Sequence, residues 1–233
     1  YEITVRDWSS DVCSSDRLAF VLTAFALFRL GAIPIMGLPA NREADIAALC
    51  RLAEPVAYIT TDKYGSTEYR SIVETLSSGH PYLKYFITDN GGIEDTIPLE
   101  SLRRPDPVIN WVPPHFTETA VLLLSGGTTG TPKLIPRRHT DYVYNARAAA
   151  KRCRLDEDSA YLVVLPVAHN FSLSSPGIIG TLLSGGKVVL SESAGSDTAF
   201  DLIEREKITF TALVPALLGL WLKANGSDRK SVV

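Results

Sequence analysis

The run SGGTTGTPK at positions 125–133 carries the clearest chemistry in the sequence. Its three glycines allow the backbone to approach a ligand and turn N–H groups toward it, while its threonine hydroxyls add donors. Its lysine adds a compact positive charge suited to phosphate oxygens. The run therefore predicts a phosphate-binding loop, with an ordinary glycine-rich turn after a strand as the alternative. The predicted phosphate-binding residues are Ser125, Gly126, Gly127, Thr128, Thr129, Gly130, Thr131 and Lys133.

This loop differs from the Walker loop of P-loop NTPases. A Walker loop places its lysine directly after the second glycine and a serine or threonine directly after the lysine. Here Thr131 and Pro132 separate Gly130 from Lys133. The sequence therefore predicts an anion site of another kind.

A second group of polar residues lies in LPVAHNFSLSSPG, at positions 165–177. His169 and Asn170 stand where an apolar segment ends, and ligands of open α/β sheets gather outside the carboxyl ends of strands. The position suggests a binding site. Taken without their neighbours, however, these residues are better interpreted in local roles, with His169 capping or packing nearby and Asn170 turning the chain.

The elements that would position these residues alternate between helical and β-branched patterns, which is typical of a largely parallel sheet covered by helices. We expect an α/β fold of layered sheets with flanking helices, as one layered domain with two lobes and a polar connection at 90–116. The expected helices are 18–31, 42–53, 69–78, 140–154, 174–183, 199–207 and a last one ending at 222. The expected strands are 32–37, 56–60, 83–89, 120–125, 161–166, 187–191 and 208–214.

The composition excludes several function classes. The chain has 233 residues, 45% of them hydrophobic and 21% charged, with a net charge of −3, so nothing indicates a basic face for nucleic acid. Cys13, Cys50 and Cys153 are far apart and odd in number, which argues against a disulfide framework and favours a reducing cytoplasm. The apolar stretch 18–30 is shorter than a membrane span and is interrupted by Thr23 and Arg29, so we expect a buried helix and no membrane partner.

Both ends of the chain have an unusual composition. Residues 1–16 (YEITVRDWSSDVCSSD) lack apolar periodicity and resemble a translated sequencing adapter, and residues 228–233 (DRKSVV) match the translation of GATCGGAAGAGCGTCGTG. We hypothesise that residues 1–16 and 227–233 are adapter-derived and that 17–226 is the natural segment. A disordered leader or linker is the alternative for the first segment.

SGGTTGTPK closely resembles the signature loop of the adenylate-forming superfamily, which includes acyl-CoA ligases, luciferases and peptide-synthetase adenylation domains. In that family the loop holds the β- and γ-phosphates of ATP. The resemblance implies that 17–226 is part of the large N-terminal adenylation domain. It also implies ATP and Mg²⁺ as cofactors.

A wider resemblance covers 18–224 and points to the aryl acid subgroup, the 2,3-dihydroxybenzoate-AMP ligases of catechol siderophore pathways. It is carried by ALFRLGAIPIMGLPANR, LIPRRHTDYVYN, LPVAHNFSLSSPG, GGKVVLS and LIEREKITFTALVPALLGLWL. By this resemblance Asn170 and Ser175 bind the ring hydroxyls and His169 lines the carboxylate end. Arg138 departs from the usual threonine of the subgroup and is interpreted as a neutral surface change.

The resemblance further implies two half-reactions. An aryl carboxylate attacks the α-phosphorus of ATP and releases pyrophosphate, and the aryl group then passes to the phosphopantetheine thiol of an aryl carrier protein. Such chemistry depends on positioning and charge neutralisation rather than on a protein nucleophile. We assign no catalytic residue in this chain, because the family's catalytic lysine belongs to a small C-terminal domain. Lys133 is a phosphate binder, and the chain alone is expected to be nearly inactive.

Several alternatives remain open. Salicylate-activating relatives tend to carry cysteine where Ser175 stands, so serine favours 2,3-dihydroxybenzoate over salicylate. Another acyl- or aryl-CoA ligase is possible within the same class. Outside it are a non-catalytic adenylation-like module that docks partners and a simple phosphate-binding regulatory domain.

Overall fold

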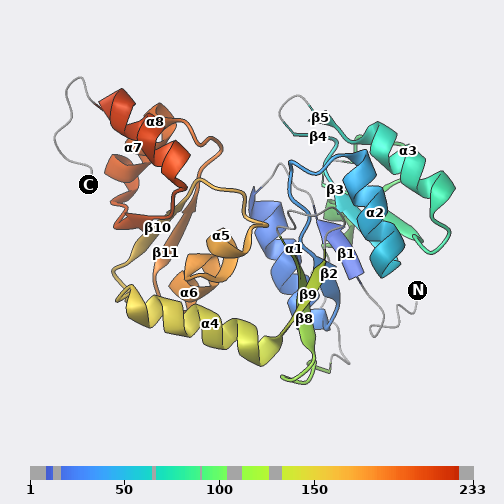
Figure 1. Cartoon of the computed structure of the whole chain (residues 1–233), viewed down its shortest axis with the longest axis horizontal. Coiled ribbons are helices and arrows are strands. Elements are labelled where there is room, and N and C mark those ends of the chain that lie inside the picture. The colour runs from blue at the N-terminus through green and yellow to red at the C-terminus, as the bar shows by residue number, and fades with distance from the viewer. Residues whose placement is uncertain are drawn as a thin grey trace. The chain divides into compact units, whose positions relative to one another are not determined.

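The computed structural model describes residues 9–12, 17–64, 67–89, 91–103, 112–125 and 133–225. The chain divides into two compact units, Tyr1–Tyr142 and Val143–Val233. The boundary lies inside helix α4 (His139–Arg152), not in the polar connection at 90–116. The elements of both units are labelled in Figure 1.

The first unit is built on a sheet whose described strands follow the order β7-β6-β3-β1-β2-β8-β9. Every neighbouring pair in this order is parallel except β8–β9, which is antiparallel. A separate antiparallel pair is formed by β4 (Lys63–Tyr64) and β5 (Thr67–Glu68). The strands of the large sheet are β1 (Ser9–Val12), β2 (Ile33–Ile35), β3 (Ala57–Thr60), β6 (Tyr85–Thr88), β7 (Ile97–Pro98), β8 (Thr119–Leu124) and β9 (Leu134–Arg138).

Helices cover both faces of this sheet (Figure 1). Successive strand residues point to opposite faces, so Tyr58 and Ile59 of β3 serve different layers. Tyr58 packs in a buried cluster with residues of α2 and α3, whereas Ile59 faces α1 across an apolar cavity. The helical elements are α1 (Arg17–Leu30), α2 (Glu43–Ala53), α3 (Arg70–Gly79) and the short 3₁₀ helix η2 (Leu99–Leu102).

The second unit contains a parallel sheet of β11 (Lys187–Leu190), β10 (Ala160–Val163) and β12 (Phe210–Thr211), in that order. Leu162 of β10 packs with the buried Ala199 and Trp221 of α7 and α8. The remaining helices are α5 (Asn170–Ser174), α6 (Gly177–Leu183), α7 (Ser196–Glu206) and α8 (Pro215–Asn225).

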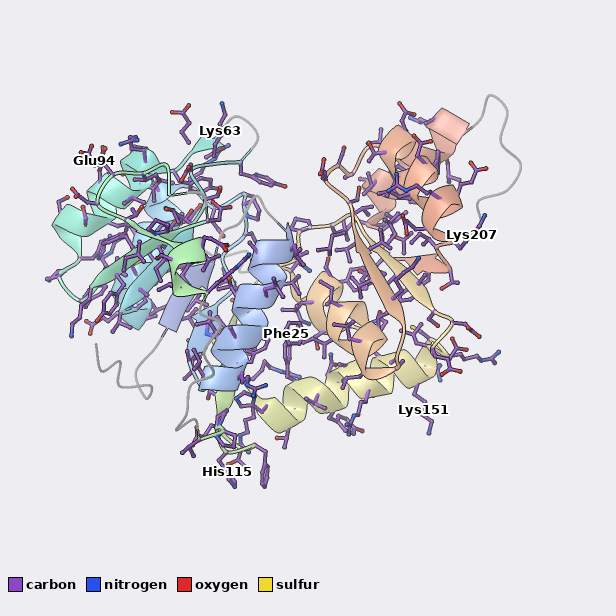
Figure 2. All side chains as sticks on the ribbon, turned by 180° about the vertical axis from the view of Figure 1, so that it is seen from behind. Phe25, Lys63, Glu94, His115, Lys151 and Lys207 are labelled. Atoms are coloured by element: carbon purple, nitrogen blue, oxygen red, sulfur yellow. The ribbon has the colours of Figure 1, made fainter. Side chains whose placement is uncertain are left out.

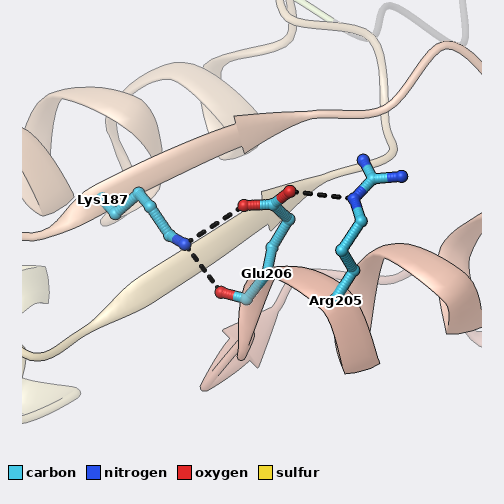
Figure 3. Close-up of polar contacts among 3 residues, drawn as sticks. All are labelled: Lys187, Arg205 and Glu206. Carbon is cyan, nitrogen blue, oxygen red and sulfur yellow. Dashed lines mark hydrogen bonds and ion pairs between the residues drawn. The ribbon is translucent and has the colours of Figure 1, made fainter.

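The C-terminal end of α7 is tied to the edge strand β11 (Figure 3). The Lys187 ammonium donates to the backbone oxygen of Glu206 at 2.7 Å and lies 3.3 Å from its carboxylate, which Arg205 also contacts at 3.0 Å. A cation is favourable at a helix C-terminus because the last carbonyls lack helical partners. These hydrogen bonds, first that from Arg205 and then that from Lys187, lower the pKa of the Glu206 carboxyl.

The expected α/β class is confirmed, and most expected elements are present within a few residues. Three differences bear on the candidate site. The segment after the phosphate loop forms a strand, β9, where we expected none. The single helix expected at 174–183 is replaced by two helices, α5 and α6, because the backbone of Ser175 between them is not helical. Ser9–Val12, to which we assigned no element, forms β1 between β2 and β3.

None of the helices in the described part of the chain is both long and apolar enough to cross a membrane.

Candidate functional site

The predicted aryl acid residues lie in a short segment that we call the His-Asn turn, residues 169–177, in the second unit. It follows the buried strand β10 and contains α5 and the start of α6. His169 is the N-cap of α5, and its Nδ1 accepts the backbone N–H of Phe171 at 3.2 Å. His169 therefore does have the local capping role considered as an alternative.

Capping also determines which nitrogen of His169 remains available. A neutral imidazole has one N–H donor and one acceptor nitrogen. Because Nδ1 accepts from Phe171, the proton of the neutral ring is assigned to Nε2. His169 is exposed, so this Nε2–H can donate to an anionic group near the turn.

The structure brings Asn170 and Ser175 together. The Asn170 amide nitrogen lies 3.5 Å from Ser175 Oγ and donates to it. Asn170 Oδ1 is buried and has no hydrogen-bond partner among the described residues. Buried polar atoms are usually paired, so an unpaired acceptor beside a polar side chain is expected to bind a ligand donor or water.

Asn145, on α4, is a third member of this group that the sequence reasoning did not identify. Its amide nitrogen donates to Ser175 Oγ at 2.9 Å and to the backbone oxygen of Ser174 at 3.0 Å. Thirty residues separate it from Ser175, so no local motif connects them. The sequence offered one signal. Asn145 is a polar residue on the helix face that also carries two buried residues, Tyr142 three positions before it and Ala146 one position after it.

Glycine is required where the turn closes. Gly177 has φ of +54°, and a Cβ at this position would lie 2.3 Å from the backbone oxygen of Ser172. A left-handed backbone conformation and such a close approach both exclude larger residues. Gly177 thus allows the start of α6 to pack directly against α5.

Tyr161 lies beneath the turn, in β10. Its ring stacks on Phe210 of β12, with centroids 4.8 Å apart and planes 10° apart. Burial raises the pKa of the Tyr161 phenol to about 12, against a smaller lowering by a hydrogen bond with Ser172. Tyr161 is therefore protonated at neutral pH and is part of the packing under the site.

The phosphate loop, residues 125–133, connects β8 to β9 in the first unit. At its ends, the backbone N–H of Ser125 donates to the carbonyl of Lys133 at 2.9 Å, and the N–H of Lys133 donates to Ser125 Oγ at 3.1 Å. These bonds continue the antiparallel ladder, in which Leu124 faces Leu134. The predicted phosphate binders at the two ends are thus brought together. Those between them, Gly126, Gly127, Thr128, Thr129, Gly130 and Thr131, lie outside the described residues.

The phosphate loop and the His-Asn turn belong to different units. The expectation that they serve one reaction therefore stays a prediction.

The first unit also contains an apolar cavity of about 480 Å³. It lies among α1, the strands β3 and β6 and the 3₁₀ helix η2, with Arg103 as the charged residue in its lining. Such a lining offers few groups to orient a phosphate or an aryl acid. We assign neither ligand to this cavity.

His, Cys, Asp and Glu side chains, the usual metal ligands, are scattered through the described part of the chain. No group of three or more His, Cys, Asp or Glu side chains there is arranged to hold a metal ion.

Comparison with known proteins gives a consistent family. Residues 12–232 match the family model described as AMP-binding enzyme. A 2,3-dihydroxybenzoate-AMP ligase of Bacillus subtilis is 47% identical over 210 residues, covering 90% of this chain and 38% of that protein. A salicyl-AMP ligase / salicyl-S-ArCP synthetase of Mycobacterium tuberculosis is 38% identical, covering 88% of this chain and 36% of its own length.

A solved structure agrees with these sequence relatives. The apo structure of Mycobacterium smegmatis MbtA superimposes with a TM-score of 0.87 at 37% identity, covering 94% of this chain and 41% of that one. The chain therefore spans less than half the length of the relatives that it matches.

Proposed function

This chain belongs to the AMP-binding enzyme family, and from that premise we propose that the protein containing it uses ATP to activate an aryl acid. The proposed product is the aryl adenylate, formed with release of pyrophosphate, and 2,3-dihydroxybenzoate is the favoured acid. The aryl group then passes to the phosphopantetheine thiol of an aryl carrier protein, in siderophore biosynthesis. The similarity to a 2,3-dihydroxybenzoate-AMP ligase supports this choice.

The observation that carries the proposal is the pairing of Asn170 with Ser175 at the His-Asn turn. Their side chains lie within hydrogen-bonding distance, and Asn170 Oδ1 is a buried acceptor without a partner among the described residues. A site built to bond a hydroxyl rejects an acid that lacks it, because its polar groups are then left unpaired. The geometry thus favours a benzoic acid with ring hydroxyls.

The described residues suggest how the chain would contribute to the first half-reaction. The His169 Nε2–H is free to orient the carboxylate, while Lys133 and the loop that it ends would bind phosphate oxygens. A carboxylate oxygen attacks the α-phosphorus, the bond to the β-phosphate oxygen breaks, and pyrophosphate leaves. No side chain needs to form a covalent bond, so positioning and charge account for the role of these residues.

ATP is a substrate of the proposed reaction, and Mg²⁺ is its expected cofactor. When bound, Mg²⁺ would neutralise charge on the phosphates of ATP. We propose the cytoplasm as the compartment, because the three cysteines are far apart and odd in number, which favours a reducing environment.

Salicylate is the second candidate acid, because this chain is also similar to a salicyl-AMP ligase. Both acids carry a hydroxyl next to the carboxylate, and only 2,3-dihydroxybenzoate carries the second one. The Ser175 hydroxyl is the side chain that we expect to separate them.

The test is ATP–pyrophosphate exchange by the whole protein with 2,3-dihydroxybenzoate, salicylate, benzoate and an aliphatic acid. We expect the highest kcat/KM with 2,3-dihydroxybenzoate and the lowest with the aliphatic acid. Exchange that prefers aliphatic acids would contradict the proposal. Absence of exchange with every acid, from a folded protein that still binds a carrier protein, would instead indicate a non-catalytic docking module.

A further inference from the structure

The hydroxyl of Ser175 acts as the acceptor in both of its hydrogen bonds. It receives the amide N–H of Asn145 at 2.9 Å and that of Asn170 at 3.5 Å. A hydroxyl oxygen has two acceptor positions and one proton to donate. With both acceptor positions taken by amides, the O–H bond of Ser175 points to a third partner.

The orientation of the Asn145 amide follows from its second contact. The backbone oxygen of Ser174 can only accept, and it lies 3.0 Å from the Asn145 side chain. The atom facing it must therefore be the NH₂ group, because the amide oxygen would be repelled there. The same NH₂ group faces Ser175, which makes Asn145 a donor to that hydroxyl.

Close packing of two helices holds Asn145 in this position. A Cβ on Gly180 of α6 would lie 3.0 Å from the backbone oxygen of Ala146 and 3.5 Å from Cβ of Ala150, both on α4. Small residues at this crossing let the helix backbones approach closely. Asn145 lies next to Ala146 on α4, so its amide is presented to the turn from a fixed helix.

We propose that Asn145 is a positioning residue that sets the polarity of the ring-hydroxyl site. This inference rests on the proposed function and deepens it. Asn145 holds Ser175 as a donor, while the unpaired Asn170 Oδ1 is an acceptor. The pair is therefore suited to a ring oxygen that accepts from Ser175 and also carries a proton to donate to Asn170. A phenol meets both requirements, whereas a methyl ether or a halide at the same ring position can at most accept.

The test uses ATP–pyrophosphate exchange by the whole protein. The measured quantity is the kcat/KM for 2,3-dihydroxybenzoate divided by that for benzoate, which lacks ring hydroxyls. Asn145→Leu keeps a similar volume but cannot donate, and it should lower this ratio about three- to tenfold. Asn145→Asp is nearly isosteric but turns an acceptor toward Ser175, and it should lower the ratio at least as far.

Two further arms separate positioning from a purely structural role. In a Ser175→Ala background, Asn145→Leu should leave the ratio unchanged, because Asn145 acts through the hydroxyl that is now absent. Wild-type protein should also prefer 2,3-dihydroxybenzoate over its methyl ethers.

Two results would overturn this inference. One is an unchanged ratio in both Asn145 variants, including the case in which activity toward 2,3-dihydroxybenzoate and benzoate falls in equal proportion. The other is an equal fall of the ratio with and without Ser175. Wild-type protein with no exchange for any benzoic acid would instead contradict the proposed function itself, and this inference would fall with it.

Discussion

The phosphate loop and the His-Asn turn both follow strands with buried residues, yet they are held in different ways. The loop is closed by its own ends, because Ser125 and Lys133 hydrogen bond to each other across the β8–β9 hairpin. The turn depends on a distant helix, since Asn145 of α4 donates to both Ser174 and Ser175. A single local segment can bind a charged group. Recognition of the hydroxyls on an aromatic ring requires side chains from separate elements.

The largest expected effect concerns the close packing at Gly177, where the end of the His-Asn turn meets α5. Gly177→Ala should lower the free energy of unfolding by roughly 2–5 kcal/mol, because the new Cβ meets a backbone oxygen at a positive φ. Chemical denaturation followed by circular dichroism measures this change. Gly219→Ala is the matched control, since nothing lies within 4 Å of a Cβ there in α8. It should stabilise the chain by about 0.5–1 kcal/mol.

The next prediction distinguishes the phosphate loop from the His-Asn turn by the substrate whose kinetics change. Lys133→Ala should lower kcat/KM for ATP roughly 10- to 100-fold in pyrophosphate exchange, because a hydrogen bond to a charged group is lost. The preference among benzoic acids should stay as in wild type. Lys151→Ala is a suitable control, because Lys151 is exposed on α4 (Figure 2). An equal loss in both lysine variants would remove the distinction between the segments.

A smaller and complementary effect is expected in the turn. Ser175→Cys replaces a hydroxyl with a thiol, which is a weaker donor and acceptor. It should raise the preference for salicylate over 2,3-dihydroxybenzoate about three- to tenfold, with the KM for ATP unchanged. Competition between the two acids in the exchange assay measures this ratio. A ratio equal to that of wild type would argue against contact between Ser175 and the ring.

The smallest expected effect is a difference in acid sensitivity between the two units. Burial lowers the pKa of His80 and His139 in the first unit, with nearby Arg51 adding to the effect at His80 and Glu118 opposing it at His139. The unfolded chain takes up these protons near pH 6.5 while the folded chain stays neutral. Stability is therefore complete above that pH and falls as the pH drops below it.

In the second unit the corresponding shift belongs to a carboxyl group. The pKa of Glu206 is lowered from 4.5, so its contribution is complete above that pH and is lost only in more acidic solution. The first unit should thus weaken first as the pH falls from 6.5 toward 4.5, as measured by denaturant midpoints. A double His80→Gln, His139→Gln variant should flatten the pH dependence in that range. A slope that survives both changes would assign it to other groups.

The two segments also differ in how far they could be predicted from sequence. The phosphate loop is contiguous, so residue types and order were enough to predict its position after a strand. Its return strand β9 was missed because Pro136 interrupts the pattern, although proline is tolerated in a terminal strand. Asn170 and Ser175 lie within hydrogen-bonding distance, and their binding of ring hydroxyls stays a prediction.

The role of Asn145 could not be predicted from the sequence. Its role depends on the crossing of α4 and α6. The two helices approach closely there because Ala146, Ala150 and Gly180 are small residues. Alanine is common in helices because of its high helix propensity, so Ala146 and Ala150 did not by themselves indicate a close contact. Without that contact, a lone asparagine in a polar helix could not be assigned to a turn thirty residues away.

Pro136 also bears on how this protein could behave at high concentration. Strand β9 stands last in the described strand order, where an open row of backbone groups can recruit a second chain. Proline removes one donor from that row, and the neighbouring Arg137 and Arg138 bring like charges that repel an identical strand. The sequence that returns the chain from the phosphate loop thus also protects it from edge-to-edge aggregation.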